Sequence, residues 1–395
     1  MQPLRIGIDV TPLRGLKTGV GFYLENLLLA LRKRPEVELT YFTGFGWVTD
    51  PVAADATASR TWLPMQLLGR VAGALGPLAA QAKETFNDIC VRPQFNDHAR
   101  FGLNVVHHTE LQVYKGSTPA VLTIFDLSCL RHPETHPATR VAWHRRQLPR
   151  ALAAAAHVIT ISEFSRREIS NYFGVPTDRL SVTHCGVSRD FRPRASEATR
   201  ATLEPFGLRP QEYFLTVGTM EPRKNLATLI RAHAALEPSL QSRFPLVVVG
   251  KQGWKAKTTM TLAASHHSHG TLKLLGYVDS EVLPWLYAGA MAFAYPSLYE
   301  GFGLPPLEAM ASGTPTVVSQ CSSLPEVVGD AALQVSPMDV EDWRQALTEL
   351  ANNEVLRTRL STLGLAQASK FSWEQTADQT LRVYQMLATA STPRQ

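Results

Sequence analysis

Paired cysteine motifs, long apolar runs and a leader-like N-terminus are all missing from this sequence, and each absence excludes a class of protein. The four cysteines among 395 residues stand singly, without a C-x-x-C pair, so we expect reduced, buried thiols rather than a disulfide scaffold. No run of 18 or more uncharged apolar residues occurs, so no membrane-spanning helix is expected. The N-terminal MQPLRIGIDV enters a strand-like run directly, which predicts a cytoplasmic protein.

Charge is unevenly distributed along the chain. Residues 1–200 carry 24 Lys and Arg against 17 Asp and Glu, whereas residues 201–395 carry 15 against 17. The basic first half indicates an anionic partner, such as phospholipid, nucleic acid or a phosphorylated acceptor. No motif interleaves aromatic and basic residues, and this disfavours nucleic acid.

Strand-like and helix-like segments alternate along the whole chain, which is typical of an α/β protein with mostly parallel sheets. We expect strands at 5–10, 38–42, 105–107, 120–124, 157–161 and 180–184, and again at 213–217, 246–249, 271–275, 291–295 and 316–319. The pattern predicts two doubly wound, Rossmann-like domains, 1–190 and 211–375, that face each other across a cleft. A linker at 191–210 joins them, and a C-terminal helix at 376–395 is expected to pack back on the first domain.

The stretch 299-YEGFGLPPLEAM-310 places Glu300 in a loop after an expected strand and Glu308 in the following helix. Gly301 and Gly303 allow the backbone to approach a ligand closely, and the two prolines suit a first helical turn. Carboxylates beside a helix N-terminus are poor phosphate ligands but good acceptors for hydroxyl groups. We therefore assign them to sugar hydroxyls, with a solvated loop as the alternative.

Three further loops follow strands of the same half: 218-GTMEPRKN-225, 250-GKQGW-254 and 276-GYVDS-280. The adjacent Arg223 and Lys224 can neutralise a diphosphate, and Asn225 is a candidate helix cap. Because the carboxyl ends of parallel strands share one edge of the sheet, we expect a nucleotide to bind there.

Taken together, these segments and 5-RIGIDVTPLRGLKTGVGFY-23 resemble a family 4 glycosyltransferase of the GT-B fold, on its mannosyltransferase-like branch. The resemblance covers nearly the whole chain. It rests most specifically on the two glutamates that frame the motif together with the upstream Arg-Lys pair.

The resemblance implies roles for individual residues. Arg223 and Lys224 would bind the donor diphosphate, Glu300 the transferred sugar and Glu308 the ribose hydroxyls. Asp126 would be the active-site residue of the first domain. Further donor contacts would come mainly from backbone groups, at Gly19, Gly21, Gly218, Val278, Gly301, Phe302, Gly303 and Leu304.

One departure from the family pattern concerns a histidine. Many relatives carry His-Asp where this chain has Phe125-Asp126, so the sugar contact that this histidine makes in the family is missing here. Two readings of His107 and His108, at the end of a neighbouring strand, stay open: one of them substitutes for the missing histidine, or both are structural.

The implied reaction moves a hexose, with mannose or rhamnose favoured, from a GDP-sugar to a hydroxyl of a saccharide or lipid-linked acceptor. It retains the anomeric configuration and needs neither metal nor other cofactor. A cell-surface polysaccharide pathway is expected, such as O-antigen, capsule or exopolysaccharide. Two alternatives stay open: a UDP-sugar donor, or a non-catalytic scaffold that binds nucleotide sugar.

Residues 62–79 show helical spacing of apolar residues next to basic ones. They predict either an interfacial helix on the cytoplasmic face of the inner membrane, close to a polyprenyl-diphosphate-linked acceptor, or a helix that faces the core.

Overall fold

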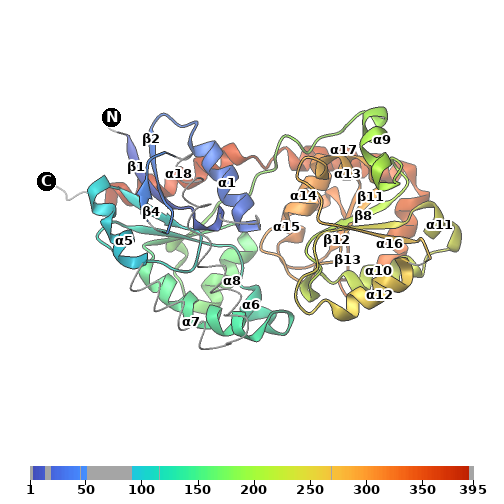
Figure 1. Ribbon diagram of the computed structural model, residues 1–395, viewed down its shortest axis with the longest axis horizontal. Helices are drawn as coiled ribbons and strands as arrows, with labels where there is room; N and C mark the ends of the chain where they lie inside the picture. Colours follow the sequence, from blue (N-terminus) through green and yellow to red (C-terminus); the bar gives the residue numbers. More distant parts are fainter. Residues whose placement is uncertain are drawn as a thin grey trace. The chain divides into compact units, whose positions relative to one another are not determined.

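The computed structural model describes residues 3–13, 19–44, 46–50, 91–114, 116–267 and 269–390. The chain divides into two compact units (Figure 1). The first comprises residues 1–130, 138–184 and 373–395, and the second comprises 131–137 and 185–372. The expected amphipathic helix at 62–79 lies outside the described residues.

The first unit contains a seven-stranded sheet in the order β3-β2-β1-β4-β5-β6-β7. Every neighbouring pair is parallel except β2 and β3. In Figure 1, α1 and α18 cover one face and α7 and α8 cover the other. The strands are β1 (Leu4–Asp9), β2 (Val37–Phe42), β3 (Trp47–Val48), β4 (Val105–His108), β5 (Ala120–Ile124), β6 (His157–Thr160) and β7 (Leu180–Val182).

The helices of the first unit start and end at recognisable signals. In α8 (Glu163–Phe173), Ser162 caps the N-terminus by accepting from the Ser165 amide, and Gly174 follows the last turn in the left-handed conformation. The others are α1 (Gly19–Leu31), α5 (Arg92–Asn96), α6 (Ser128–Arg131), α7 (Ala138–Ala154) and α18 (Trp373–Ala390).

The C-terminal helix α18 belongs to the first unit, as expected for the end of the chain. It lies beside α1, where the rings of Tyr23 and Trp373 are 5.9 Å apart. Thr376 Oγ1 donates to the His184 carbonyl at 2.6 Å. The chain therefore returns to its first unit after completing the second.

The second unit contains a six-stranded, fully parallel sheet in the order β10-β9-β8-β11-β12-β13. The strands are β8 (Phe214–Val217), β9 (Leu246–Val249), β10 (Leu272–Gly276), β11 (Ala292–Tyr295), β12 (Thr316–Ser319) and β13 (Leu333–Val335). Phe214, Leu246 and Val248 pack with the fully buried Trp343 in the core of this unit. Strands that are buried on both faces need such apolar runs.

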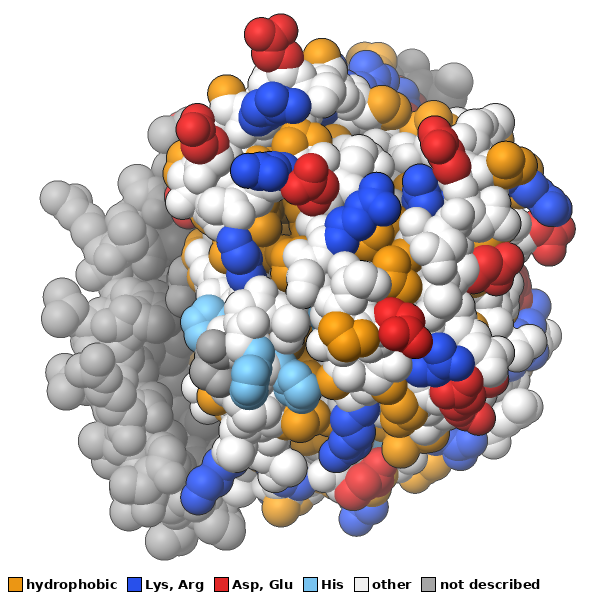
Figure 2. Space-filling view, turned by 90° about the vertical axis from the view of Figure 1, so that its right-hand side faces the viewer, with side chains coloured by type: hydrophobic (Ala, Val, Ile, Leu, Met, Phe, Trp, Pro, Cys, Tyr) orange, Lys and Arg blue, Asp and Glu red, His pale blue; other side chains and the backbone are white. Residues whose placement is uncertain are grey.

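Helices also cover both faces of the second sheet, with α10, α12 and α16 on one side and α9, α13, α14 and α17 on the other (Figure 1). The helices are α9 (Ser196–Leu203), α10 (Leu226–Ala234), α11 (Pro238–Arg243), α12 (Lys257–His267), α13 (Leu283–Gly289), α14 (Leu304–Ala311), α15 (Leu324–Val328), α16 (Val340–Asn352) and α17 (Glu354–Ala368). On the face that Figure 2 shows, positive and negative side chains are interspersed, consistent with the near-neutral second half.

The structure differs from the expected linker at 191–210, because this segment is part of the second unit. Its helix α9 packs on α13, with Thr199 and Leu203 buried and the site of a Cβ at Gly289 filled by their side chains. Thr199 and Leu203 are four residues apart, so they lie on the same face of α9 and pack together on α13. The surrounding Arg, Pro and Ala residues obscured this helical spacing in the sequence. The chain leaves the first unit at His184 instead.

The described residues also bear on membrane-spanning helices and on the cysteines. None of the described helices is long and apolar enough to cross a membrane. Cys129, Cys185 and Cys321 are free thiols, and Cys90 lies outside the described ranges.

In both sheets the order of the strands along the chain reverses at one point, the switch point of the sheet. The reversal lies between β1 and β4 in the first unit and between β8 and β11 in the second. In open parallel sheets, ligands bind at the carboxyl ends of the strands at such a switch point. The loops after β8 and β11 contain the Arg-Lys pair and the first glutamate of the motif.

Candidate active site

The loop after β8 presents the two cations. The short 3-10 helix η7 (Pro222–Lys224) carries Arg223 and Lys224, and Asn225 follows at φ +52° before α10 begins. The Asn225 side chain does not cap α10 as expected. Its Nδ2 donates instead to the carbonyls of Pro296 and Pro337, at 3.1 and 2.6 Å, which ties this loop to the loop after β11.

The loop after β11 places one carboxylate against both cations. Glu300 Oε1 lies 2.6 Å from Lys224 Nζ, and Glu300 Oε2 lies 3.1 Å from Arg223 Nη1. The hydroxyls of Ser297 and Tyr295 also donate to Glu300 Oε1. A single, almost fully buried carboxylate, 8% exposed, therefore organises the two cations.

Arg223 has two further partners. Its Nη1 donates to the Tyr299 carbonyl at 2.6 Å, and its Nη2 donates to Glu221 Oε1 at 2.7 Å. The guanidinium plane is thus fixed by contacts from its own loop and from the loop after β11. A planar group held in this way is suited to a ligand with fixed oxygen geometry, such as a phosphate.

The electrostatics favour an ionised Glu300. Burial alone would raise the pKa of this carboxyl. Lys224 and Arg223, with hydrogen bonds from Lys224 and Ser297, outweigh burial and lower the pKa to about 2. Burial lowers the pKa of Lys224 from its usual value, and the neighbouring Glu300 opposes that effect.

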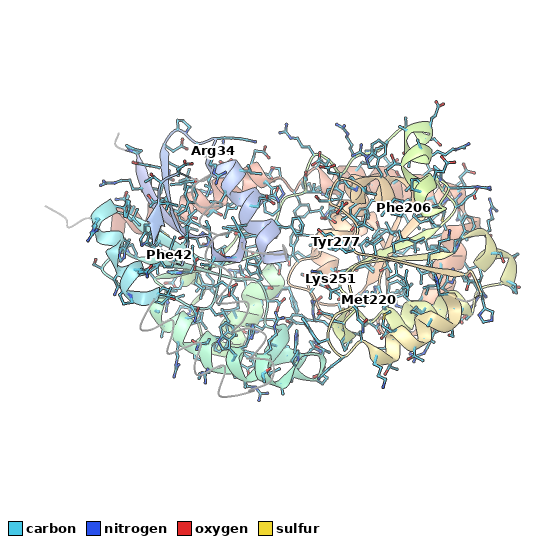
Figure 3. The ribbon with its side chains drawn as sticks, in the orientation of Figure 1. Arg34, Phe42, Phe206, Met220, Lys251 and Tyr277 are labelled. Atoms are coloured by element: carbon cyan, nitrogen blue, oxygen red, sulfur yellow. The ribbon has the colours of Figure 1, made fainter. Side chains whose placement is uncertain are left out.

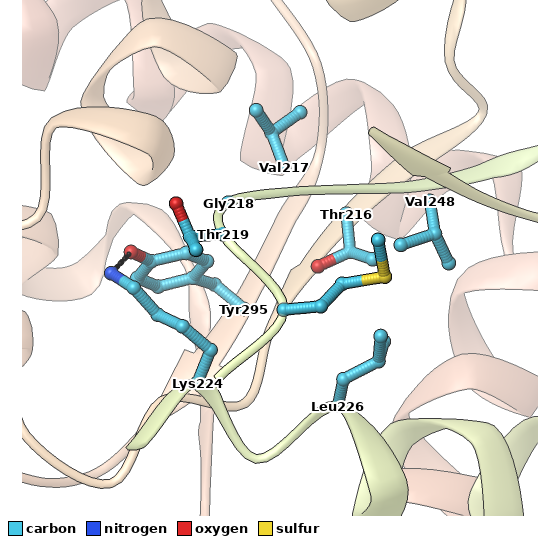
Figure 4. Close-up of a pocket in the computed structure, with 9 residues that line it drawn as sticks. Thr216, Val217, Gly218, Thr219, Lys224, Leu226, Val248 and Tyr295 are labelled. Atoms are coloured by element: carbon cyan, nitrogen blue, oxygen red, sulfur yellow. Dashed lines mark hydrogen bonds between the residues drawn. The ribbon is translucent and has the colours of Figure 1, made fainter. Parts of the chain in front are cut away.

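A small pocket lies behind Lys224 at the end of β8 (Figure 4). It is lined by side chains such as Thr216, Met220, Leu226 and Tyr295, and Lys224 Nζ donates to the Tyr295 hydroxyl at 2.7 Å across it. Its volume of about 20 Å³ admits roughly one water molecule. The pocket is therefore a feature of the packing behind the cations, too small for a sugar nucleotide.

The second glutamate of the motif has a different environment. Glu308 in α14 accepts a hydrogen bond from the Tyr287 hydroxyl at 2.9 Å. Burial raises the pKa of Glu308 to about 7, although the Tyr287 bond acts in the opposite direction. The two carboxylates therefore differ in charge near neutral pH, which suits different tasks.

The backbone between the glutamates enters α14 through Gly303. This residue has φ +119°, and a Cβ there would lie 2.8 Å from Leu324 Cδ2, so only glycine fits. Phe302 turns its ring into the core, 5.7 Å from Phe371, leaving its backbone in the loop. Pro305 and Pro306 remove two amide donors from the first turn of α14, so an anion here depends mainly on the cations.

The exposed edge of this site includes two side chains that sequence reasoning missed. Tyr277, 60% exposed, precedes Val278, and Lys251 Nζ lies 5.8 Å from its ring centre. Figure 3 shows both beside Met220 at the same edge of the sheet. An aromatic residue in the exposed loop 276-GYVDS-280 was the available signal.

The expected residues of the first unit are placed differently from a sugar-binding cluster. His107 is fully buried, with Nδ1 2.6 Å from the Tyr384 hydroxyl and Nε2 2.7 Å from Thr123 Oγ1. Burial and the neighbouring His108 lower the pKa of His107 to about 3, with Asp9 opposing. His107 thus joins β4 to β5 and α18, which is what the structural alternative for this histidine predicts.

His108 is also fully buried, with Nδ1 3.9 Å from Asp9 Oδ2 and its ring packed on Phe95. Asp126 follows β5 and accepts from the Ser128 amide at 2.7 Å, at the start of α6. Gly19 and Gly21 form the first turn of α1. All of these residues belong to the first unit, whereas the cations and both glutamates of the motif belong to the second.

Comparison with known proteins identifies the fold and the family. Residues 18–191 match the model of Glycosyltransferase Family 4, and residues 203–365 match that of Glycosyl transferases group 1. The chain is 35% identical to the O-antigen chain mannosyltransferase B of Escherichia coli over 390 residues, covering 97% of this chain and 100% of that protein. The chain belongs to the family 4 glycosyltransferases.

Solved structures of the same architecture support the GT-B fold of this glycosyltransferase. Sucrose-phosphate synthase from Thermosynechococcus elongatus superposes with a TM-score of 0.73 at 19% identity, covering 98% of this chain and 100% of that chain. Anabaena HepE in complex with UDP and glucose superposes with a TM-score of 0.68 at 16% identity, covering 97% and 100%. At such low identity the likeness shows the fold alone.

The chemistry available at this glycosyltransferase site follows from its charges. Arg223 and Lys224 are preorganised cations at the end of β8, where negative charge can be stabilised without further rearrangement of the loops. Among the described residues, no group of three or more His, Cys, Asp or Glu side chains is arranged to hold a metal ion.

The Lys224→Met variant should be less stable than wild type by about 3 kcal/mol at pH 7, because one partner of a buried ion pair is lost while Glu300 stays buried. The folded pKa of Glu300, about 2, lies below its ordinary 4.5, so the stabilisation is present above about pH 4.5 and is lost as pH falls towards 2. The deficit should therefore shrink on acidification. Urea unfolding at pH 7 and pH 3.5 measures it.

Lys257→Met, at an exposed lysine of α12, is the matched control and should change stability little at either pH. A Lys224→Met protein as stable as wild type at pH 7, or one whose deficit grows on acidification, would contradict the assigned ion pair.

Proposed function

We propose that this glycosyltransferase transfers mannose from GDP-mannose to a hydroxyl of a growing O-antigen saccharide, with retention of anomeric configuration and without a metal ion. The carrying observation is the end-to-end similarity to an O-antigen chain mannosyltransferase, which extends over both units. The RfbU mannosyltransferase of Salmonella typhimurium, also an O-antigen enzyme, is 27% identical over 245 residues, covering 62% of this chain and 63% of that protein.

In the proposed reaction, the diphosphate of the donor binds Arg223 and Lys224. The bond between the anomeric carbon and the diphosphate oxygen breaks, and the acceptor oxygen forms the new bond on the same face of the sugar. The acceptor proton passes to the departing diphosphate, which acts as the base for this step. The two cations stabilise the negative charge that develops on the leaving group.

Glu300 changes partners in this proposal. Its carboxylate holds Lys224 and Arg223 through short contacts, so a diphosphate oxygen that binds these cations shares them with Glu300. The Glu300 carboxylate then accepts a hydrogen bond from a hydroxyl of the transferred sugar, and Glu308 accepts hydrogen bonds from the ribose hydroxyls. Backbone groups of Gly301, Gly303 and Leu304 complete the donor site, and Val278 meets the base.

The partners outside the donor site are proposed from charge. The first half carries the net positive charge. We therefore propose that it binds a polyprenyl-diphosphate-linked acceptor and contacts the cytoplasmic face of the inner membrane, both of which are anionic. A GDP-rhamnose donor would use the same cations. A UDP-sugar donor is the principal alternative, because nothing in the 276–280 backbone distinguishes guanine from uracil.

GDP should bind at least about tenfold more tightly than UDP, and Lys224→Met should weaken GDP binding at least about tenfold, the loss expected for one charge-assisted hydrogen bond. Isothermal titration in the presence of EDTA measures both. GDP-mannose should then support transfer to a mannoside acceptor in EDTA, with the product anomer assigned by NMR. Tighter binding of UDP would overturn the donor, and loss of transfer in EDTA would overturn metal independence.

The affinity for GDP should increase as pH rises through about 7, because the ionised Glu308 carboxylate is the better acceptor for ribose hydroxyls and its folded pKa lies there. In Glu308→Gln, this contribution should be missing. Titration calorimetry from pH 5.5 to 8.5 compares the two proteins. Protonation of GDP itself affects both equally, so the variant serves as the control for it. Identical pH profiles would remove Glu308 from the ribose site.

A further inference from the structure

A short segment between β5 and α7 belongs to the second unit although the chain on both sides of it belongs to the first. This segment, Arg131–Pro137, is called the strap here. It contains the 3-10 helix η4 (Pro133–Thr135), closed by hydrogen bonds from the Thr135 amide and hydroxyl to the His132 carbonyl, at 3.0 and 2.7 Å. The chain thus visits the second unit before the main crossing at His184.

The strap is anchored rather than solvated. Trp254 Nε1 donates to the Thr135 carbonyl at 2.8 Å, and Lys255 Nζ donates to the Glu134 carbonyl at 2.7 Å. The Trp254 ring also packs on His136 at 5.8 Å between centres. Thr135 and His136 are buried, whereas Arg131 and Glu134 are exposed, so burial is concentrated near the end of the strap that contacts this loop.

The anchoring loop is itself bound to the loop that carries the cations. The Met220 amide donates to the Lys251 carbonyl at 2.9 Å, and the Gly253 amide donates to the Met220 carbonyl at 3.0 Å. A Cβ at Gly253 would lie 2.8 Å from Thr219 Cγ2, so this close approach requires glycine. The motif 250-GKQGW-254 therefore connects the strap to the cation loop, a role its glycines alone did not reveal.

The strap also touches the loop after β11. The ring of His132 packs on Tyr299, with centres 5.1 Å apart and planes at 57°. Tyr299 is almost fully buried, and its carbonyl accepts from Arg223 Nη1 at 2.6 Å. One side chain of the strap thus lies against the residue whose backbone orients the guanidinium.

We infer that the strap is a positioning element of the donor site and that His132, through ring packing on Tyr299, is the residue by which it holds Arg223 in place. This inference rests on the proposed function. The strap fixes the loops after β9 and β11 relative to each other, and both of these loops contact the loop that carries Arg223. A displacement of about 1 Å at such a group costs on the order of a hundredfold in rate.

The test compares His132→Ala, His132→Phe and the control His266→Ala, a half-buried histidine of α12 for which no contact with the strap is seen. His132→Ala should lower kcat about tenfold with a donor KM within about threefold of wild type, because the reacting geometry is lost while the cations remain. His132→Phe keeps an aromatic ring on Tyr299 and should restore kcat to within about threefold. His266→Ala should match wild type.

Hydrogen–deuterium exchange gives a second readout that needs no substrate. Amides of residues 297–303 should exchange faster in His132→Ala and at the wild-type rate in His132→Phe. This comparison holds even if GDP-mannose proves to be the wrong donor, in which case the proposed function fails and the inference about the strap is judged by exchange alone.

Trp254→Phe keeps an aromatic ring but removes the indole N–H that donates to the Thr135 carbonyl, so it should reproduce part of the His132→Ala effect. The double variant should lose less activity than the two single losses multiplied, because both act through the same strap. Unchanged kcat and exchange in His132→Ala would overturn the inference. A His132→Phe protein as impaired as His132→Ala would also overturn it, since the ring nitrogens rather than packing would then matter.

Discussion

The candidate active site depends on one carboxylate shared between two cations. Glu300 contacts Lys224 and Arg223 at 2.6 and 3.1 Å while only 8% of it is exposed. Taking such charges out of water is costly, and the pairing is stable only because the Ser297 and Tyr295 hydroxyls satisfy the remaining lone pairs. The cations are consequently held in place for the diphosphate that we propose they bind, whose oxygens would offer them the same kind of partner.

The fold brings these groups together from distant parts of the chain. Lys224 and Glu300 are 76 residues apart, yet β8 and β11 are neighbours on either side of the switch point, so their loops leave the sheet side by side. Backbone bonds then fix the two loops, as from the Leu298 amide to the Arg223 carbonyl at 2.8 Å. The strap is a further case of contact between distant parts of the chain, because it comes from the first half of the sequence and packs on the same group of loops.

Sequence patterns predicted the central strands well. The strands expected at 246–249, 120–124 and 316–319 have those bounds in β9, β5 and β12, because apolar runs bounded by glycine and proline are typical of buried parallel strands. The two-residue β3 and the partly exposed β13 have too few apolar residues to be predicted. The sequence could not decide between the two readings of His107, because its partners Tyr384 and Thr123 are distant in sequence. The strap went unrecognised because its anchors are backbone carbonyls.

A crystal structure of the chain with bound GDP is the most direct test of the role assigned to the shared carboxylate. Diphosphate oxygens should lie within about 3 Å of Arg223 and Lys224, the length of a charge-assisted hydrogen bond. The Lys224–Glu300 distance should then be longer than 2.6 Å. A diphosphate bound elsewhere, with both cations still held only by Glu300 and its neighbours, would contradict the assignment.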